Sequence, residues 1–497
     1  MRYISYVKIY SSLNLREVFM MKVLLITAPR DGEVTEFISP NILSYDMLHY
    51  PPLGLLAIAA EVDPRHELKV LDTVTKNMTI QESINYIVEF KPDLLGMSIV
   101  SRRIYPSTAL FRQIKELMPN LITVAGGPHV NDFSVETMRL GSIDYGLAGY
   151  CEKTFPKLVE ALDQDNVSES DLKKIPNLYY FVEDDLRSTP PSTEPVILDD
   201  LPYPRRELVN LRDYYTAVDE EQMTTLYTSR GCPYKCSFCD VQEKNYYYRS
   251  TKGIVDEFEY ILSLGIKEIA IFDDTFNMGR KRVIDMCEEI LRRGLKVKWS
   301  ARVRAHPFDR EMIKIMKEAG CVRLQCGVES LNPISLKNMK KKVTLEHIRN
   351  FFSMCDEMGI ETLGYFILGF PEETHEYRQK FYQELKRLNP TYMELSILYP
   401  LAKTPYYEDL IKNGVYERDF WGEFFKNPVR DWNVPPYRQP ELQAELNTMV
   451  DVLYKKFYLS PGFIIKELQR KTSFEMFMRK VQLAFKMMFI DWKKNPT

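Results

Sequence analysis

Three cysteines, Cys232, Cys236 and Cys239, lie within eight residues in the spacing C-x3-C-x2-C. Cysteine thiolates are the usual ligands of iron–sulfur clusters, and three of them can hold three irons of a 4Fe–4S cube. No fourth cysteine follows at a comparable spacing, so one iron would stay open for a small ligand. A zinc site, which more often uses paired Cys or Cys/His sets, and three structural cysteines are the alternatives.

The context of the triad sharpens this prediction. A strand-like segment, 223–227, leads into Thr228-Ser229-Arg230-Gly231, and Gly231 and Pro233 indicate an irregular loop. The signature resembles that of the radical S-adenosylmethionine (SAM) enzymes. The resemblance implies that the open iron binds the amino and carboxylate groups of SAM and that an electron from the cluster cleaves SAM to a 5′-deoxyadenosyl radical. It also implies that Phe238 packs near the adenine.

Composition limits the class of protein. A chain of 497 residues with 45% hydrophobic and 27% charged residues is typical of a globular protein of two to four domains. The net charge of −3 gives no reason to expect nucleic-acid binding. Eight cysteines, three of them in a metal motif, favour a reducing, cytoplasmic compartment over a disulfide scaffold. No apolar run approaches the roughly 18 residues of a membrane span.

The N-terminal third alternates strand-like and helical patterns. We predict strands at 23–28, 68–71, 93–100, 121–125 and 143–147, with helices between them, for example at 80–89 and 108–117. Short apolar runs separated by amphipathic segments indicate a doubly wound parallel sheet of Rossmann-like type. Ligands of such sheets bind at the carboxyl ends of the strands, where the glycine-rich segments fall. Residues 1–20 lack the apolar core of a signal peptide and are expected to be an extension.

With a radical SAM motif downstream, this third resembles the cobalamin-binding domain of the cobalamin-dependent class. The matching segments are Pro51-Pro52-Leu53-Gly54, 91–98, Ala125-Gly126-Gly127-Pro128-His129 and Gly149-Tyr150-Cys151-Glu152. The resemblance implies cobalamin contacts from Leu53, Gly54, Ser98, Gly126, Gly127, His129 and Glu152. The Asp-x-His-x-x-Gly motif that supplies a histidine to cobalt is absent after Asp72, so a lower histidine ligand is not expected. His129 is more typical of a pocket-lining or locally hydrogen-bonded residue.

We predict five regions along the chain: an extension at 1–20, a cobalamin-binding domain at 21–165, a proline-rich linker at 166–222, a radical SAM domain at 223–414 and a mainly helical C-terminal region at 415–497. Within the radical SAM domain, strands are expected at 225–229, 268–272, 296–301, 322–326, 363–368 and 393–398. Six strand–helix units indicate a partial (β/α)6 barrel, in which active residues follow the strands.

Polar residues fall at the ends of these predicted strands. By the family resemblance, Asp273 and Asp274 would grip the SAM amino group, and Glu329 would contact the ribose or methionine end. Arg302, at the same edge, would also bind SAM. The segment with Ile367, Gly369 and Glu372 would lie beside adenine. Helix capping is the alternative for Asp274 and Glu372.

Cys326 is a further candidate. If it faces the barrel interior, its thiol could donate a hydrogen atom near the substrate. A small buried core residue is the alternative.

The C-terminal region is rich in aromatic residues and, by resemblance, would close over the substrate. From Phe474 onward, aromatic and apolar residues recur at helical spacing beside Arg479, Lys480, Lys486, Lys493 and Lys494. Such a helix can lie on an anionic membrane surface, which would allow peripheral membrane contact, or it can simply pack on the core.

The leading hypothesis is a cobalamin-dependent radical SAM methyltransferase acting on an unactivated carbon, related to the anaerobic magnesium-protoporphyrin monomethyl ester cyclases and the hopanoid methylases. Its cofactors would be SAM, a 4Fe–4S cluster and cobalamin. Its partners would be a small-molecule substrate and an electron donor such as flavodoxin or ferredoxin. A cyclase, ring-rearranging or carbon–carbon coupling enzyme of the same family is the first alternative. A non-catalytic iron–sulfur or cobalamin sensor is the second.

Overall fold

The computed structural model describes residues 21–35, 48–164, 166–216, 219, 222–241, 243–470, 474, 477–478 and 480–482. The chain divides into two compact units. One consists of Met1–Asp31 and Gly54–Ser192, and the other of Gly32–Leu53 and Thr193–Thr497. The segment Gly32–Leu53 therefore groups with the second unit, although the sequence places it inside the predicted cobalamin-binding domain.

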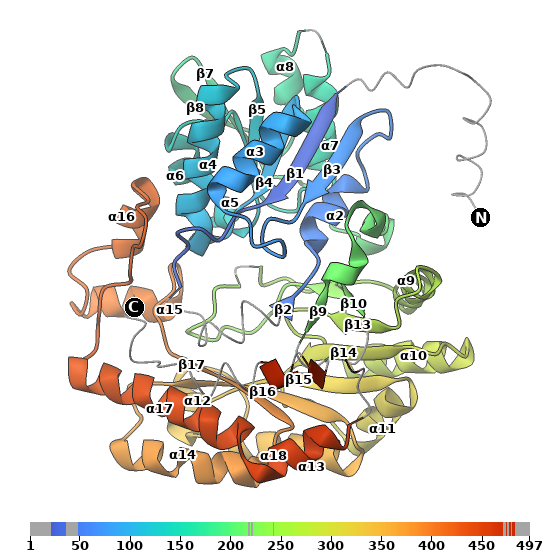
Figure 1. The fold of residues 1–497 in the computed structure, drawn as a ribbon, viewed down its shortest axis with the longest axis vertical. Coiled ribbons are helices and arrows are strands. Elements are labelled where there is room, and N and C mark those ends of the chain that lie inside the picture. Colours follow the sequence, from blue (N-terminus) through green and yellow to red (C-terminus); the bar gives the residue numbers. More distant parts are fainter. Residues whose placement is uncertain are drawn as a thin grey trace. The chain divides into compact units, whose positions relative to one another are not determined.

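The first unit is built around a seven-stranded sheet in the order β3-β1-β4-β5-β6-β7-β8. Its parallel strands are β1 (Lys22–Thr27), β3 (Glu67–Leu71), β4 (Leu94–Ser98), β5 (Ile122–Gly126) and β6 (Tyr145–Leu147). Helices lie on both faces (Figure 1): α2 (Leu53–Ala59), α3 (Ile80–Phe90), α4 (Ile104–Leu117), α5 (Pro128–Asp132), α6 (Ser134–Arg139), α7 (Thr154–Leu162) and α8 (Glu169–Leu172). The predicted doubly wound parallel arrangement is confirmed for these strands.

The predicted linker is different in the structure. β7 (Leu178–Val182) pairs antiparallel with β6, and β8 (Asp185–Ser188) pairs antiparallel with β7, so both strands extend the first sheet. Glu183 in the tight turn between them has a φ of 54°, the left-handed conformation that two-residue hairpin turns need. Glutamate is not a typical residue for such a turn, so the hairpin is hidden in the sequence among the surrounding prolines.

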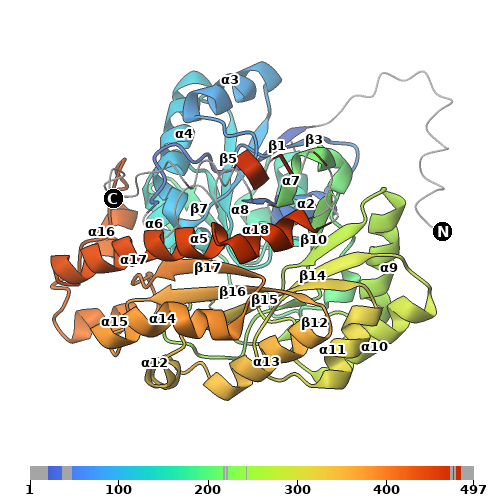
Figure 2. The ribbon, with the colours of Figure 1, turned by 60° about the horizontal axis from the view of Figure 1, so that its bottom comes forward.

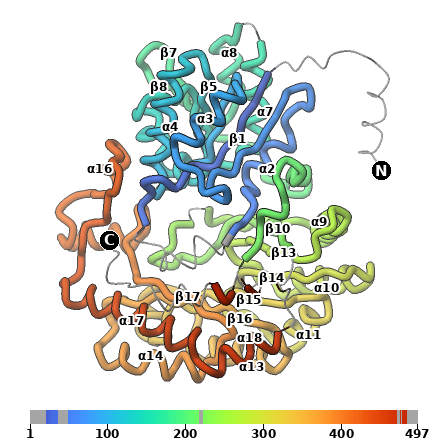
Figure 3. The backbone as a smooth tube through the Cα atoms, viewed as in Figure 1, coloured from blue at the N-terminus to red at the C-terminus, as the bar shows by residue number. Residues whose placement is uncertain are grey.

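The second unit contains a six-stranded parallel sheet whose spatial order, β10-β13-β14-β15-β16-β17, follows the chain. Figure 3 lets the chain be followed through these strands. They are β10 (Met223–Leu226), β13 (Glu268–Ile271), β14 (Lys298–Val303), β15 (Cys321–Glu329), β16 (Glu361–Leu368) and β17 (Tyr392–Ile397). The helices between them are α9 (Thr251–Ser263), α10 (Arg280–Arg292), α11 (Arg310–Glu318), α12 (Pro333–Asn338), α13 (Leu345–Glu357) and α14 (His375–Leu388). The predicted partial barrel is confirmed.

The strands of this sheet present two different faces. Ala301, Phe366 and Leu395 belong to the apolar core that packs on the helices. Their neighbours along the strands, including Arg302 and Glu394, point to the opposite face, because side chains alternate along a strand. We call this opposite face the lumenal face.

One of the C-terminal helices, α17, protects an open edge of this sheet. The helices of this region are α15 (Pro405–Lys412), α16 (Phe420–Lys426), α17 (Pro440–Tyr458) and α18 (Pro461–Leu468). Helix α17 runs along the edge strand β17 (Figure 2), where the Tyr454 hydroxyl accepts the Leu395 N–H at 2.9 Å and the Tyr458 hydroxyl accepts the Met393 N–H at 3.1 Å. Side-chain oxygens thus satisfy edge groups that would otherwise be open to another strand.

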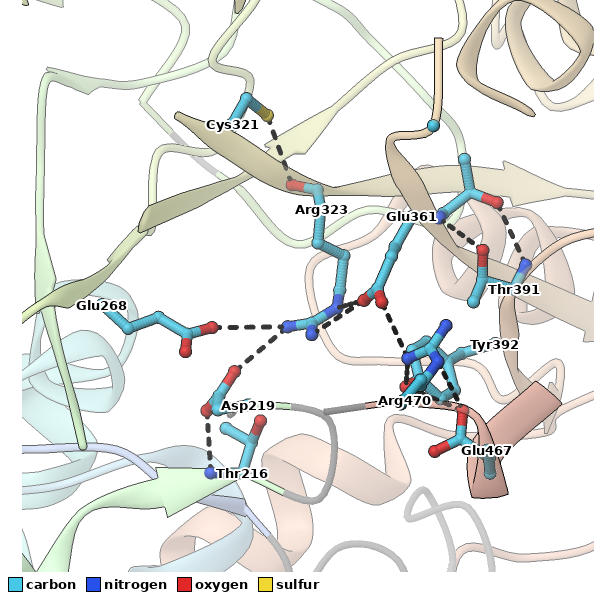
Figure 4. A network of polar contacts seen from close by, with 12 residues as sticks. Thr216, Asp219, Glu268, Cys321, Arg323, Glu361, Thr391, Tyr392, Glu467 and Arg470 are labelled. Carbon is cyan, nitrogen blue, oxygen red and sulfur yellow. Dashed lines mark hydrogen bonds and ion pairs between the residues drawn. The ribbon is translucent and has the colours of Figure 1, made fainter. Parts of the chain in front are cut away.

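A network of charged residues lies at the amino ends of the barrel strands (Figure 4). Arg323, which is 2% exposed, forms ion pairs with Asp219 at 3.0 Å, Glu361 at 3.0 Å and Glu268 at 3.9 Å. Arg470, just after α18, binds Glu361 at 2.7 Å and so ties the C-terminal region to the network. These charges are compensated within the protein.

The basic amphipathic helix predicted from Phe474 onward lies largely outside the described residues. Phe474 itself is 78% exposed, and Lys480 forms an ion pair with Glu467 at 2.9 Å. In the part of the chain that the structure describes, no helix combines the length and the apolar character needed to cross a membrane.

Candidate functional site

The three cysteines lie on a loop that is closed at its base. β11 (Ser229–Arg230) leads into the loop and pairs antiparallel with β12 (Tyr247–Tyr248), which leads out of it. Inside the loop, the Cys232 N–H donates to the Glu243 carbonyl at 3.0 Å, and the Cys239 N–H donates to the Cys236 carbonyl at 3.3 Å. The loop follows β10, and backbone hydrogen bonds within it and between Ser237 and both Met339 and Tyr406 hold its shape.

Gly231 is required where this loop begins. Its φ is 82°, and a Cβ at this position would lie 1.9 Å from the carbonyl oxygen of Asn245 on the returning arm. No side chain fits in that space, so the close approach of the two arms depends on glycine.

Asp273 fixes the entry to the loop. It is fully buried, and one carboxylate oxygen accepts the N–H groups of Thr228 at 2.7 Å and Ser229 at 3.0 Å. The other oxygen accepts both hydroxyls, that of Ser229 at 2.6 Å, and the Arg282 guanidinium lies 3.7 Å away. Four hydrogen bonds occupy the acceptor sites of a carboxylate. These contacts hold the start of the loop and occupy the acceptor sites with which the sequence predicted that Asp273 would contact SAM.

Asp274 is the more open carboxylate of the pair. It accepts the Gly231 N–H at 3.0 Å and keeps solvent-accessible surface. Partial desolvation raises the pKa of Asp274, and the neighbouring charge of Asp273 raises it further, while Gly231 and Arg302 oppose the shift. Asp274 thus remains able to accept a hydrogen bond or ion pair from a ligand.

The thiols have distinct surroundings. The Cys232 sulfur lies 3.4 Å from the Thr275 hydroxyl, and the Cys236 sulfur accepts from the Arg304 guanidinium at 3.8 Å. Arg304 is itself held by the Lys341 carbonyl and by the ring of Tyr234, 3.7 Å from the guanidinium carbon. Burial raises the pKa of Cys239 to about 11, so that metal binding would have to remove its proton.

This donor set fits a 4Fe–4S cluster. Three thiols on one loop supply one ligand to each of three irons. Among the described residues, no three Cys, His, Asp or Glu side chains converge on one point as a single metal ion would require. A cube has no such requirement, since each thiolate binds a different iron.

Glu329 occupies a strained position at the end of β15. Its φ is 64°, and the register with β16 shifts between Gly327 and Glu329. Its carboxylate forms an ion pair with the Lys341 ammonium at 2.6 Å. A Cβ at Gly327 would lie 2.6 Å from the Glu329 oxygen and 3.0 Å from the Lys341 nitrogen, so glycine makes room for the pair. The sequence indicated Glu329 but not its partner Lys341.

The predicted adenine-side residues are only partly available to a ligand. The Phe238 ring packs edge-on against Phe370, with centroids 6.4 Å apart, and Ile367 is half-buried. Gly369 has a φ of 91°; its N–H donates to Glu373 at 2.7 Å and its carbonyl accepts from Arg438 at 2.8 Å. Both backbone groups of Gly369 are therefore occupied within the protein.

Glu372 and Glu373 play different parts. Glu372 accepts from Asn338 at 2.6 Å, and the capping role considered from the sequence belongs instead to Thr374 at the start of α14. Glu373 is 7% exposed, and burial raises its pKa to about 7. Sequence reasoning missed Glu373, because nothing in the Glu-Glu pair shows which residue points inward.

Cys326 lies on the helix-facing side of β15, in contrast to the lumenal position on which the predicted catalytic role depended. It is fully buried in the apolar core, near Cys355 of α13. Burial raises the pKa of Cys326 to about 12. The structure thus agrees with the alternative of a small core residue.

In the first unit, three of the predicted cobalamin residues, Ser98, Gly126 and Gly127, lie at the carboxyl edge of the sheet. Ser98 ends β4 directly opposite Gly126 at the end of β5. Gly127 has a φ of 94°, and a Cβ there would lie 2.7 Å from the Ser98 hydroxyl. Leu53 and Gly54 begin α2. An edge with such close backbone packing fits a ligand bound at the ends of the strands.

His129 and Glu152 are both buried. His129 is fully buried, its Nδ1 lies 3.0 Å from the Ser101 hydroxyl, and its ring stacks on Phe133 with centroids 5.2 Å apart. This is the local hydrogen-bonding role considered from the sequence.

Asp72, where a cobalt-binding motif would begin, accepts from the Thr27 hydroxyl at 3.0 Å and the Val74 N–H at 3.1 Å.

The lumenal face carries polar residues that sequence reasoning missed. Tyr50, from the segment before α2, packs its ring on Phe272 with centroids 4.5 Å apart. Tyr365 donates to Gln325 at 2.9 Å, and Glu394 stands in the middle of β17. Glu394 could have been found from the sequence, because it is an ionisable residue in the otherwise largely apolar segment Tyr392–Ile397.

Comparison with known proteins assigns both units. A family model described as the radical SAM superfamily matches residues 226–385, and one described as the B12 binding domain matches residues 47–159. An uncharacterized methyltransferase of Pyrococcus horikoshii is 29% identical over 456 residues, covering 90% of this chain and 95% of that protein. The anaerobic magnesium-protoporphyrin IX monomethyl ester cyclase of Cereibacter sphaeroides is 27% identical over 349 residues, covering 68% of this chain and 56% of that protein.

The fold has a counterpart of known structure. The radical SAM methyltransferase TsrM of Kitasatospora setae, solved with tryptophan substrate and a SAM analogue, superposes with a TM-score of 0.60 at 22% identity, covering 79% of this chain and 76% of that one. SAM, a 4Fe–4S cluster and cobalamin are the cofactors that the two matched domains imply. The chain therefore carries a radical SAM domain together with a B12-binding domain.

Proposed function

We propose that this enzyme is a cobalamin-dependent radical SAM methyltransferase that methylates an unactivated carbon. When bound, the cofactors would supply the chemistry: SAM cleaved at the reduced cluster would remove a hydrogen atom from the substrate carbon and leave as 5′-deoxyadenosine, and cobalamin would deliver to that carbon a methyl group taken from a second SAM. The observation that carries the proposal is the closed three-cysteine loop at the carboxyl end of a parallel barrel, in a chain that also carries a B12-binding domain.

The loop residues would hold the cluster and leave one iron open. Cys232, Cys236 and Cys239 would each bind one iron. Asp273 would orient the strand from which the loop starts, through its contacts to Thr228 and Ser229. Its role is to position the loop, so its loss should reduce cluster incorporation more than SAM affinity in molecules that keep their cluster.

Asp274 and the Glu329–Lys341 pair would meet the polar parts of SAM. Asp274 keeps an accessible carboxylate beside the loop. Glu329 has a strained backbone next to Gly327, and strain of this kind persists where a specific geometry is needed. Phe238 and Ile367 would provide the apolar contact for adenine.

At the carboxyl edge of the first sheet, Ser98, Gly126 and Gly127 would contact cobalamin, with Leu53, Gly54 and Glu152 near them. His129 would hold this edge in place indirectly, through its contact with the Ser101 hydroxyl. Because Thr73 and Val74 follow Asp72, we propose that the protein supplies no histidine to cobalt.

Two further assignments complete the proposal. Reduction of the cluster needs a low-potential electron donor, such as a flavodoxin or ferredoxin. We propose a cytoplasmic location. Contact with a membrane surface through the C-terminal segment can be tested by liposome co-sedimentation of the full chain against a chain that ends at Lys471.

The proposal can be tested without the substrate. The anaerobically reconstituted enzyme, with hydroxocobalamin, SAM and a low-potential reductant, should form both 5′-deoxyadenosine and S-adenosylhomocysteine. The Cys236→Ala variant should form no 5′-deoxyadenosine. A wild-type enzyme that forms neither product would contradict the proposal and favour a sensor.

A cyclase is the second candidate, because a similar protein carries that name. It would cleave SAM but transfer no methyl group. Formation of 5′-deoxyadenosine without S-adenosylhomocysteine would favour this candidate over the methyltransferase.

A further inference from the structure

The lumenal face of the barrel carries two opposite charges that the protein itself does not pair. Arg302 on β14 and Glu394 on β17 are both half-buried. Within the described part of the chain, neither side chain has a hydrogen-bond or ion-pair partner. The only specific contact of the Arg302 guanidinium among these residues is with the Phe272 ring, 3.8 Å from its centroid.

The two charges belong to one electrostatic site. Burial raises the pKa of Glu394, and the positive charge of Arg302 opposes this shift, as it also does at Asp274 beside the cysteine loop. Arg302 therefore lies near both Glu394 and Asp274, the carboxylate beside the loop that would hold the cluster. A molecule that contacts both charges lies in the part of the barrel where a substrate must lie.

Aromatic residues surround these charges. Tyr50 packs on Phe272, and burial raises the pKa of its hydroxyl, which therefore stays a neutral donor. Tyr365 keeps part of its side chain accessible, and Tyr227, directly after β10, is 36% exposed. The rings offer flat apolar surface, while Arg302 and Glu394 add one cationic and one anionic group.

A substrate that enters here displaces the water that solvates both charges. A wholly apolar lipid would leave Arg302 and Glu394 buried without partners, which is strongly unfavourable. A carboxylate can bind the guanidinium fork through two hydrogen bonds. An amine, amide or hydroxyl group can donate to Glu394.

We propose that Arg302 and Glu394 form the recognition site for the substrate, which is a ring-containing molecule with a carboxylate that binds Arg302 and a hydrogen-bond donor that binds Glu394. This deepens the proposed function, on which it rests for the reaction, and it assigns Arg302 to the substrate in place of SAM. The proposal excludes hydrocarbon lipids without polar groups as the substrate.

The test uses two probes of the same shape, 3-phenylpropionate and its uncharged analogue 3-phenylpropionamide. Binding to the anaerobic holoenzyme is measured by titration calorimetry or ligand-observed NMR. The wild type should prefer the carboxylate by at least about thirtyfold, the factor typical of a desolvated charge pair. Arg302→Met should abolish this preference, and Glu394→Gln should weaken the amide, which offers the donor, more than the carboxylate.

Arg349→Met is the matched control, because Arg349 lies on α13 with its side chain 55% exposed and paired with Glu384. It should keep the wild-type preference. Equal binding of both probes, binding of neither, or a preference that survives Arg302→Met would overturn the proposal.

The same preparations are assayed for SAM cleavage without probe. Carboxylate selectivity without SAM cleavage would refute the proposed reaction but not the recognition site. Cleavage without selectivity would refute only the site.

Discussion

The two ends of the six-stranded sheet use arginine in opposite ways. At the amino ends of the strands, Arg323 is 2% exposed and forms ion pairs with three carboxylates (Figure 4). Toward the carboxyl ends, Arg302 is half-buried and, among the described residues, has no ion-pair partner. Charges that are satisfied internally stabilise a fold, whereas charges left open are available to a ligand. We therefore call the amino ends of the strands the structural end of the barrel and the carboxyl ends its working end.

The largest effect should come from Gly231→Ala at the working end. The added Cβ would lie 1.9 Å from the Asn245 carbonyl, so the loop must open and its thiols must move. We expect the variant to lose most of its iron, measured as iron per chain after reconstitution, while the circular dichroism of the protein is unchanged.

Gly265→Ala is the matched control. Gly265 has nearly the same φ, 85°, but a Cβ there would meet no atom within 4 Å. If both variants lost iron equally, backbone strain rather than the loop contact would be responsible, and the account of the loop would be wrong.

Replacing each arginine by methionine tests the comparison directly. Arg323→Met removes the guanidinium that pairs with the buried Asp219 at 3.0 Å, and removing one partner of a buried pair costs about 3–5 kcal/mol. Arg302→Met removes no internal partner and should cost less than about 1 kcal/mol. The measurement is the free energy of unfolding in urea. If the two variants lost the same free energy of unfolding, the proposed distinction between the two ends of the sheet would be wrong.

Glu373 predicts a pH dependence of stability at the working end. Its pKa of about 7 lies above the ordinary value of 4.5, so the folded protein binds this proton more tightly than the unfolded chain does. The stabilisation is present at low pH and is lost as the pH rises from 4.5 to 7, by about 3 kcal/mol in all. Glu373→Gln should flatten this part of the profile, measured by unfolding from pH 4.5 to 8. If the free energies of unfolding of the wild type and of Glu373→Gln changed with pH in parallel, the raised pKa assigned to Glu373 would be wrong.

The smallest expected effect is on the cluster potential. Arg304 donates to the Cys236 sulfur at 3.8 Å, and hydrogen bonds and positive charge near a cluster raise its reduction potential. Arg304→Gln should lower the potential by on the order of tens of millivolts in an EPR-monitored redox titration. Arg310→Gln, on an exposed side chain, is the control and should leave it unchanged. A potential that rises in Arg304→Gln would contradict this role.

The sequence revealed the architecture because the strands of both sheets are short apolar runs between amphipathic helices. It revealed the cysteine loop because three thiols at fixed spacing are a local pattern. It also assigned Asp273 to SAM, because a sequence cannot show that Thr228 and Ser229 already occupy that carboxylate. The β7–β8 hairpin was hidden by its unusual turn residue.

Long-range contacts account for the other omissions. Lys341 meets Glu329 only through the tertiary fold, across twelve positions of sequence. Tyr50 joins the barrel although its segment lies within the match to the B12-binding domain. Only strand register brings Arg302 and Glu394 to the same face, since two further strands separate β14 from β17 in the sheet.

The most direct measurement is EPR spectroscopy of the reduced, reconstituted protein with and without SAM. A cube held by Cys232, Cys236 and Cys239 alone predicts a reduced-cluster signal whose g values shift when SAM is added, because SAM binds the fourth iron. A signal that SAM leaves unchanged would mean that no iron is open to SAM, and it would contradict the proposed cluster site at the carboxyl ends of the strands.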